Sequence, residues 1–123
     1  MVLVDTSVWI EHFRRGNVGL ASRLEEGLVL MHPFVAGELA CGSLKDRQKV
    51  LSLLNSLPAV KPATHVEAMQ FMDGHRLFGR GLGWIDVHLL ASALLSGCVF
   101  WTLDKKLAQA AIDLRLQYRY ADQ

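Results

Sequence analysis

The chain has 123 residues, 51% of them hydrophobic, and its formal net charge is +1 at pH 7. This length suits one compact domain with a sizeable core, so we expect a single domain over residues 1–123. Because the charge is nearly balanced and the Lys and Arg residues are scattered, we exclude a protein that grips long nucleic acid by charge alone, and we expect no DNA binding by this chain alone.

The two cysteines, Cys41 and Cys98, lie among small or apolar residues and lack CxxC spacing. They are expected to be buried reduced thiols. The N-terminus lacks the basic segment and the long apolar segment of a secretory signal, so a cytoplasmic location is expected.

Short apolar runs alternate with segments of helical periodicity in chain order. Strands are expected at residues 2–4, 28–31 and 99–103, with 59–62 as a short connection or strand and 116–120 as an edge strand. Helices are expected at residues 6–15, 17–26, 32–42, 45–56, 64–78, around Asp86 as far as Gly97, and from 104 to about 111. This alternation predicts an α/β fold with a mainly parallel sheet covered by helices on both faces.

The stretch from Val87 to Leu103 contains no Asp, Glu, Lys or Arg. It is close to the lower length limit of a membrane-spanning helix, about 17 residues. However, Gly97 separates a Leu/Ala-rich piece from the β-branched and aromatic VFWTL. A buried helix, a glycine stop and a buried strand explain this run better, so we expect no membrane span.

Four acidic residues stand at positions where chemistry is expected. Asp5 and Asp104 each follow a buried strand directly, and parallel sheets bind ligands beyond the carboxyl ends of their strands. Singly, these two acids are ordinary helix N-caps, and Asp86 is an acid in a helical first turn. Glu38 and Asp86, however, lie on helices that are apolar almost all round, so their carboxylates are expected to face inward or toward a cleft.

Convergence of these carboxylates would need a compensating charge. Two carboxylates about 4 Å apart repel by about 4 kcal/mol at an effective dielectric constant of 20, which exceeds the roughly 1 kcal/mol of an N-cap. Oxygen-only ligands suit Mg²⁺ or Mn²⁺. Zinc is disfavoured because the five histidines show no HxxxH pair and no spacing to the cysteines, and we expect surface or helix-flank positions for them: His12, His32, His65, His75 and His88.

Basic residues near the acids are candidates for phosphate binding. Lys105 is the first choice because it follows Asp104, and Arg80 and Arg14 are weaker candidates. The glycine-rich GRGLG at residues 79–83 lacks the preceding strand and the GxGxxG spacing of a dinucleotide site, so it is expected to be a flexible loop between helices. Trp9, Phe13 and the Leu-rich helix at 50–57 are candidates for an apolar groove or, more simply, for core.

Four segments in this order carry a family resemblance: VDTSVWIE, VAGELACG, WIDVHLLASALLSG and WTLDKKLA. Together they resemble the PIN-domain ribonucleases over essentially the whole chain, most closely the VapC toxins of bacterial toxin–antitoxin pairs. The resemblance implies a sheet of four or five parallel strands with flanking helices, and a metal-dependent endonuclease that acts on RNA. By motif, the family's four acids correspond to Asp5, Glu38, Asp86 and Asp104.

The resemblance also implies supporting residues and partners. The family's hydroxyl residues match Thr6, Ser7 and Thr102, and Arg115 stands where such chains often have glycine. We hypothesise that Asp5 and Asp86 bind the metal directly. Glu38 and Asp104 would complete the pocket and hold metal-bound water or a second ion, and the metal would activate a water for in-line attack on a phosphate. The implied partners are a second copy of the chain and a VapB-type antitoxin, which lays a helix in a groove and extends a basic residue toward the acids.

Three other functions remain open at this stage. One is a PIN nuclease of RNA processing that is not a toxin. Another is a phosphohydrolase with Asp5 as nucleophile, which would want a second acid two residues later, where Ser7 stands. The third is a PIN-like module that only binds a partner; loss of an acid would be its signature, and no acid is missing.

Overall fold

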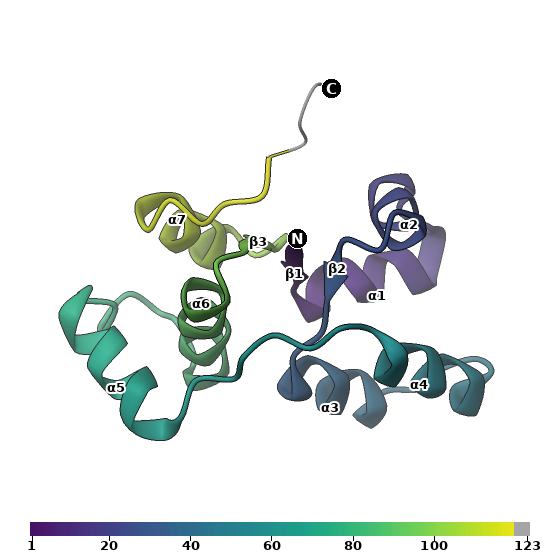
Figure 1. The fold of residues 1–123 in the computed structure, drawn as a ribbon, viewed down its shortest axis with the longest axis horizontal. Helices are drawn as coiled ribbons and strands as arrows, with labels where there is room; N and C mark the ends of the chain where they lie inside the picture. Colours follow the sequence, from purple (N-terminus) through teal and green to yellow (C-terminus); the bar gives the residue numbers. More distant parts are fainter. Residues whose placement is uncertain (120–123) are drawn as a thin grey trace.

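A computed structural model describes residues 1–119 of the chain. Its centre is a parallel sheet of β1 (Val2–Val4), β2 (Val29–Leu30) and β3 (Val99–Trp101) in the order β2-β1-β3. All three residues of β1 are buried, which is typical of a parallel strand covered on both faces. The sheet lies in the middle of the molecule with helices on both sides, as predicted (Figure 1).

The expectation of four or five strands is wrong for the described residues, which form three. Residues 59–62 pair at one point only, where Ala59 bridges Met31, and the prolines on both sides, Pro58 and Pro62, have no backbone amide to donate. The tail likewise forms a single bridge, between Gln117 and Phe100. The last residue of this expected strand, at position 120, lies outside the described part of the chain.

Seven helices surround the sheet within residues 1–119, close to the predicted positions. They are α1 (Thr6–Arg15), α2 (Val18–Glu25), α3 (Pro33–Cys41), α4 (Arg47–Ser56), α5 (His65–Gly74), α6 (Trp84–Ser96) and α7 (Lys105–Asp113). Local signals set most of their starts: Asn17 accepts a hydrogen bond from the Leu20 amide, and Thr64 and Glu67 form a reciprocal capping box. Helix α5 ends four residues earlier than predicted, and Arg76 beyond it has a positive φ of 53°.

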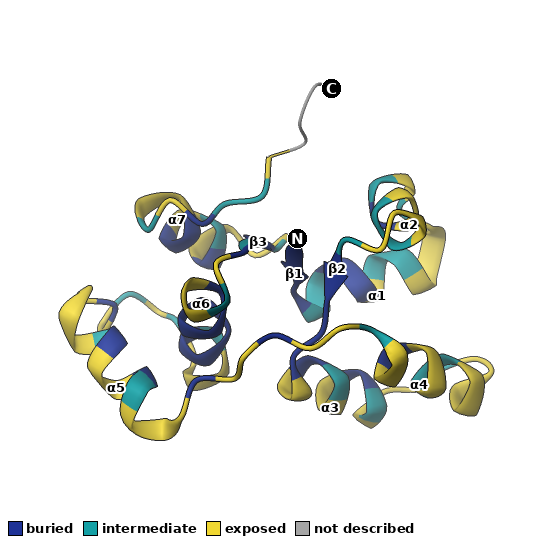
Figure 2. Ribbon diagram, viewed as in Figure 1, coloured by how far each residue is buried: buried dark blue, intermediate teal, exposed yellow. Residues whose placement is uncertain are grey.

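Helix α6 is the most deeply buried helix of the described structure. Seven consecutive residues, from Val87 to Ala93, are buried (Figure 2). Gly97 ends the helix in the left-handed conformation, with φ 65°, and the chain then enters β3. This helix–glycine–strand order is the predicted one, and no helix in the described part of the chain has the length and apolarity needed to cross a membrane.

Two expectations about burial are wrong, those for His88 and Cys41. His88 is 5% exposed in the middle of α6, and His32, although it flanks a helix as predicted, is only 1% exposed. Its Nδ1 caps α3 by accepting a hydrogen bond from the Phe34 amide at 2.9 Å, so this atom of the buried ring has a partner. Cys98 is a buried free thiol as expected, whereas Cys41 is exposed at the end of α3.

The buried His32 should make stability depend on pH. Burial, and next the charge of His88, lower the pKa of His32 from 6.5 to about 4. Between these values the unfolded chain binds a proton that the folded chain rejects, so the free energy of unfolding should fall by up to about 3 kcal/mol as pH drops from about 6.5 to about 4. His32→Asn keeps a capping acceptor and removes the titration, so urea unfolding of this variant should depend less on pH over that range.

His75→Asn is the matched control, because His75 is exposed and should leave the pH dependence as in the wild type. If the free energy of unfolding changes with pH equally in His32→Asn and in the wild type, the proposed effect of His32 is contradicted.

Candidate active site

Asp5 stands where β1 ends, at the carboxyl edge of the central strand. Its amide donates to the Trp101 carbonyl at 2.9 Å, which extends the pairing of β1 with β3 by one residue. The side chain is 8% exposed and makes no capping hydrogen bond to α1, although Asp5 occupies the N-cap position. The simple capping interpretation therefore does not explain why an acid stands here.

Two hydroxyl groups hold the Asp5 carboxylate instead. Ser7 Oγ donates to Asp5 Oδ2 at 2.8 Å, and Thr102 Oγ1 donates to the same oxygen at 2.7 Å. Ser7 Oγ also accepts from the Leu103 amide at 3.0 Å, so the start of α1 is tied to the segment after β3. The second carboxylate oxygen, Oδ1, accepts no side-chain hydrogen bond from residues 1–119 and is available to a ligand.

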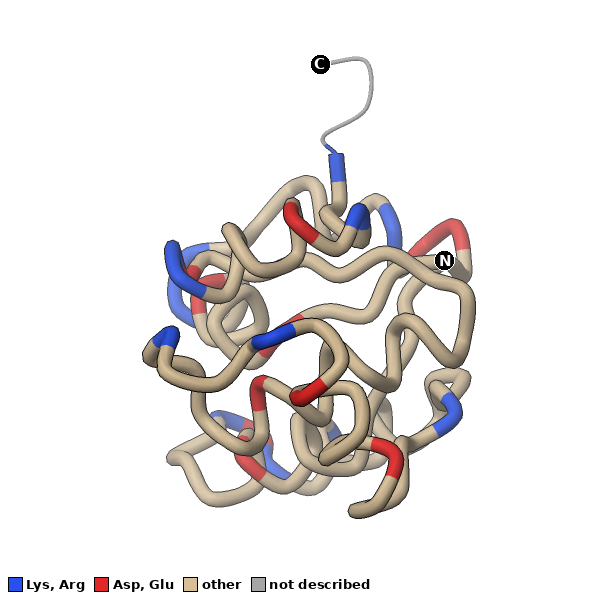
Figure 3. Tube along the Cα trace, turned by 90° about the vertical axis from the view of Figure 1, so that its left-hand side faces the viewer, with Lys and Arg blue, Asp and Glu red and all other residues tan. Residues whose placement is uncertain are grey.

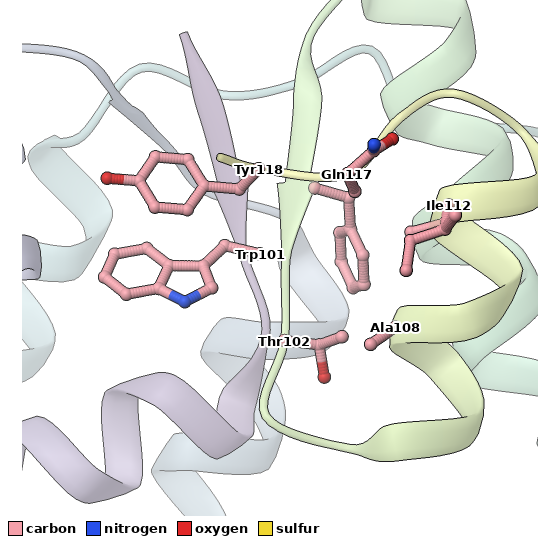
Figure 4. Close-up of a pocket in the computed structure, with 8 residues that line it drawn as sticks. Trp101, Thr102, Ala108, Ile112, Gln117 and Tyr118 are labelled. Carbon is pink, nitrogen blue, oxygen red and sulfur yellow. The ribbon is translucent and has the colours of Figure 1, made fainter. Parts of the chain in front are cut away.

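The end of β3 places Thr102 and Trp101 on opposite sides of the strand, as strand alternation requires (Figure 4). The indole of Trp101 stacks on the ring of Tyr118 with centroids 4.4 Å apart, while Thr102 lies on the side of Ala108 in α7. A cavity of about 170 Å³ between β3, α7 and residues 117–118 has no carboxylate among its described lining residues, and it shares Thr102 with the acidic site.

Asp104 combines a structural role with a place beside Asp5. Its Oδ1 accepts from the Leu107 amide at 2.9 Å, which caps α7 as predicted. Its own amide donates to Thr102 Oγ1 at 3.0 Å, the hydroxyl that holds Asp5. One threonine therefore links the two acids that follow β1 and β3.

Asp86 lies in the first turn of α6, where its Oδ2 accepts from the Gly83 amide at 2.9 Å. Burial raises the pKa of the Asp86 carboxyl; the Gly83 hydrogen bond opposes this, and the negative charges of Asp5 and Asp104 raise the pKa further. The net direction is upward. Three of the four predicted acids, Asp5, Asp86 and Asp104, are therefore close enough for their charges to interact.

Glu38 occupies the exposed side of α3 and lines a cavity, which is the second of the two orientations expected of it. Thr6 Oγ1 donates to Glu38 Oε1 at 3.0 Å, and because Thr6 directly follows Asp5, this bond brings Glu38 near the end of β1. The cavity that Glu38 lines has a volume of about 180 Å³ and lies between α1 and α3; it is here called the α1–α3 groove, and its lining residues are Ile10, Phe13, Arg14, Glu38, Leu39, Gly42, Ser43 and Leu44. Trp9, a groove candidate in the sequence, is 1% exposed and belongs to the core.

The carboxylates provide the donor type that Mg²⁺ and Mn²⁺ prefer, but they do not already form a coordination cage. Within residues 1–119, no three Asp, Glu, His or Cys side chains lie close enough together to hold an ion among them. The charges of Asp5 and Asp104 nevertheless act on Asp86. This arrangement fits a small hard cation that keeps several waters and takes few direct protein ligands.

Basic residues do not form a continuous band around the site. Blue and red segments alternate over the face in Figure 3, which agrees with the scattered Lys and Arg of the sequence. Arg80 forms an ion pair with Asp113 at 2.8 Å, and Lys105 is exposed with no ion pair within the described residues. Two contributors that sequence reasoning missed are the Gly83 amide and Lys106, which contacts the glycine-rich loop.

The parallel sheet, with acids beyond the carboxyl ends of β1 and β3, can be compared with known families of α/β proteins. Residues 2–113 match the family model described as PIN domain. The chain therefore belongs to the PIN-domain family, and within it to the VapC type. It is 46% identical over 114 residues to Ribonuclease VapC32 of Mycobacterium tuberculosis, a match that covers 92% of both chains.

Solved structures show the same fold at lower identity. VapBC-1 from nontypeable Haemophilus influenzae superimposes with a TM-score of 0.71 and 22% identity, covering 97% of both chains. FitAcB from Neisseria gonorrhoeae gives a TM-score of 0.65 and 20% identity, covering 91% of this chain and 94% of the other. PAE2754 from Pyrobaculum aerophilum gives 0.61 and 17%, covering 94% and 90% respectively.

Proposed function

We propose that this chain is a Mg²⁺- or Mn²⁺-dependent endoribonuclease that acts as the toxin of a toxin–antitoxin pair. The observation that carries the proposal is the Asp5 carboxylate, which is nearly buried, held by two hydroxyls and placed where its charge acts on Asp86. An acid held in this way, with one oxygen free of side-chain partners, is suited to binding a cation. The similarity to a protein named as a ribonuclease supports RNA as the substrate.

In this proposal Asp5 and Asp86 hold the cation, and Glu38 and Asp104 complete the pocket. When bound, the cation supplies charge neutralisation at the scissile phosphate and lowers the pKa of an attacking water. Thr102 and Ser7 fix the orientation of Asp5, and Thr6 does the same for Glu38.

Glu38 can contact water. It is exposed, and its Oε2 accepts no side-chain hydrogen bond from the described residues. It can therefore orient a water or accept a proton at that oxygen. Lys105, exposed beside Asp104, is a supporting residue of the proposal.

Removal of one carboxylate should abolish RNA cleavage without unfolding the chain. Asp5→Asn and Asp86→Asn keep the side-chain shape and remove a charged ligand, so single-turnover cleavage of RNA should fall by more than about 100-fold in each. Treatment of the wild type with EDTA should have the same effect, and added Mg²⁺ or Mn²⁺ should restore cleavage. Asp46→Asn is the matched control, because Asp46 is exposed at the start of α4.

Retention of normal cleavage in folded Asp5→Asn or Asp86→Asn would refute the assignment of these residues. Cleavage that persists in EDTA would refute the metal dependence.

The proposal includes a VapB-type antitoxin as protein partner. Two of the similar solved structures are VapBC-1 and a FitAB assembly bound to a DNA fragment, which supports a partner chain for this protein too. The α1–α3 groove is our candidate docking surface, because it joins exposed apolar residues, Phe13 at 39% and Ile10 at 38% exposure, to the acid Glu38. A helix with an apolar face and a nearby basic residue would match both properties.

A charge placed in the groove should weaken binding of the antitoxin without lowering the rate of RNA cleavage. Phe13→Asp should raise the dissociation constant for the cognate antitoxin by at least about tenfold, because a buried aromatic contact becomes a desolvated charge. RNA cleavage by the free variant should stay at the wild-type level. Val18→Asp is the control, since Val18 is exposed at the start of α2 and does not line the groove; equal antitoxin affinity for the Phe13 variant and this control would exclude the groove.

A homodimer and a cytoplasmic location complete the proposal. Exposed apolar residues on α5 and at the start of α6, Val66, Met69, Trp84 and Ile85, offer a surface for a second copy. A monomeric mass in light scattering at every protein concentration would contradict the proposed homodimer.

A PIN nuclease of RNA processing differs from this proposal only in its substrate and in the lack of an antitoxin gene beside its own. The phosphohydrolase is less favoured, since Ser7 holds Asp5 where such an enzyme would place a second acid.

A further inference from the structure

The loop at residues 79–83 between α5 and α6 is tied to the acidic site at its last residue. Gly79 and Gly81 have positive φ values of 73° and 79°, so the loop uses backbone conformations that favour glycine. Gly83 ends the loop and donates its amide to Asp86. The loop that sequence reasoning expected to be flexible is thus anchored to one of the four acids.

Lys106 of α7 lies across this loop. A Cβ atom built at Gly81 would approach Lys106 Nζ to 2.9 Å and its Cδ to 3.2 Å. The lysine stem and ammonium therefore occupy the space that any other residue at position 81 would fill. Lys106 is also two residues beyond Asp104, so this contact joins the two segments that carry Asp86 and Asp104.

The ammonium of Lys106 has no carboxylate partner in the described structure. The two ion pairs within residues 1–119 join Arg23 to Glu26 and Arg80 to Asp113. Arg80, the other cation of the loop, thus already has a carboxylate partner, whereas Lys106 is exposed and has none within residues 1–119.

A nuclease with four carboxylates at its site repels the phosphates of its substrate. A bound cation offsets this repulsion at one phosphate only, and the neighbouring phosphates still need contact with a positively charged side chain. Lysine serves this purpose as a compact point charge. We propose that Lys106, seated on Gly81, binds a backbone phosphate of the RNA next to the one that is cleaved. This inference rests on the proposed ribonuclease function and adds a substrate-binding residue to it.

The test compares Lys106→Met, which keeps the stem and removes the charge, with Lys105→Met as the matched neighbour. Binding of a single-stranded RNA oligonucleotide is measured at several salt concentrations in the Asp86→Asn background, where the RNA is not cut. Loss of one phosphate contact should raise the dissociation constant about five- to tenfold and reduce the slope of log K against log salt by about 0.7. Lys105→Met should change both quantities less.

Gly81→Ala provides a second route to the same site, because the added Cβ would meet the ammonium; since φ at position 81 is 79°, urea unfolding of this variant checks that the loop strain leaves the fold intact. Combined with Lys106→Met, it should weaken RNA binding no further than Lys106→Met alone. Lys106→Arg should retain most of the affinity. Urea unfolding of Lys106→Met should match the wild type, since the residue is exposed, and this separates binding from folding.

An unchanged salt slope and affinity in folded Lys106→Met would overturn the inference, as would equal losses in the two lysine variants. If Asp5→Asn abolishes cleavage while Lys106→Met binds RNA normally, the ribonuclease proposal stands and only the lysine assignment fails. If the wild type cuts no RNA, both fail.

Discussion

The geometry of the site depends on the burial of one negative charge, the carboxylate of Asp5, at the end of the central strand. A carboxylate that is 8% exposed loses most of its hydration, and hydrogen bonds to the charged group must offset that loss. Ser7 and Thr102 provide two such bonds to a single oxygen. Because these residues come from α1 and from the segment after β3, the same bonds fix how both segments leave the sheet.

Each of the other acids is held by a donor of its own. Asp86 accepts from the Gly83 amide, Asp104 from the Leu107 amide, and Glu38 from the hydroxyl of Thr6. These local donors keep like charges near one another without a cation between them. The pKa of Asp86 is nevertheless raised, mostly by burial and further by the charges of Asp5 and Asp104. A divalent cation would offset both the lost hydration and the repulsion between the carboxylates, which is the physical reason for proposing one.

Local patterns in the sequence predicted the parts of the structure that depend on neighbouring residues. Asp5 could be placed at a strand end because a buried apolar run stops directly before it, whereas the strand expected at 99–103 ends at Trp101, so that Thr102 and the exposed Leu103 precede Asp104. The bond between Thr6 and Glu38 joins residues 32 apart and could not be inferred, because it depends on how α1 and α3 pack. The extra strands failed for a related reason: an apolar run shows burial, but pairing also needs free amides, which the prolines around Ala59 remove. The burial of His88 could not be inferred from the lack of a zinc-binding spacing, and Lys105 was preferred to Lys106 because the contact of Lys106 with Gly81 is not visible in the sequence.

If Asp5, oriented by its hydroxyl partners, binds a divalent cation, electron paramagnetic resonance of Mn²⁺ will detect that binding. We expect saturable binding to the wild type, loss of binding in Asp5→Asn, and affinity about 10- to 100-fold weaker in Thr102→Val, which keeps the side-chain shape and removes one donor to Asp5. Equal Mn²⁺ affinity in all three proteins, or no saturable binding to the wild type, would contradict cation binding by Asp5.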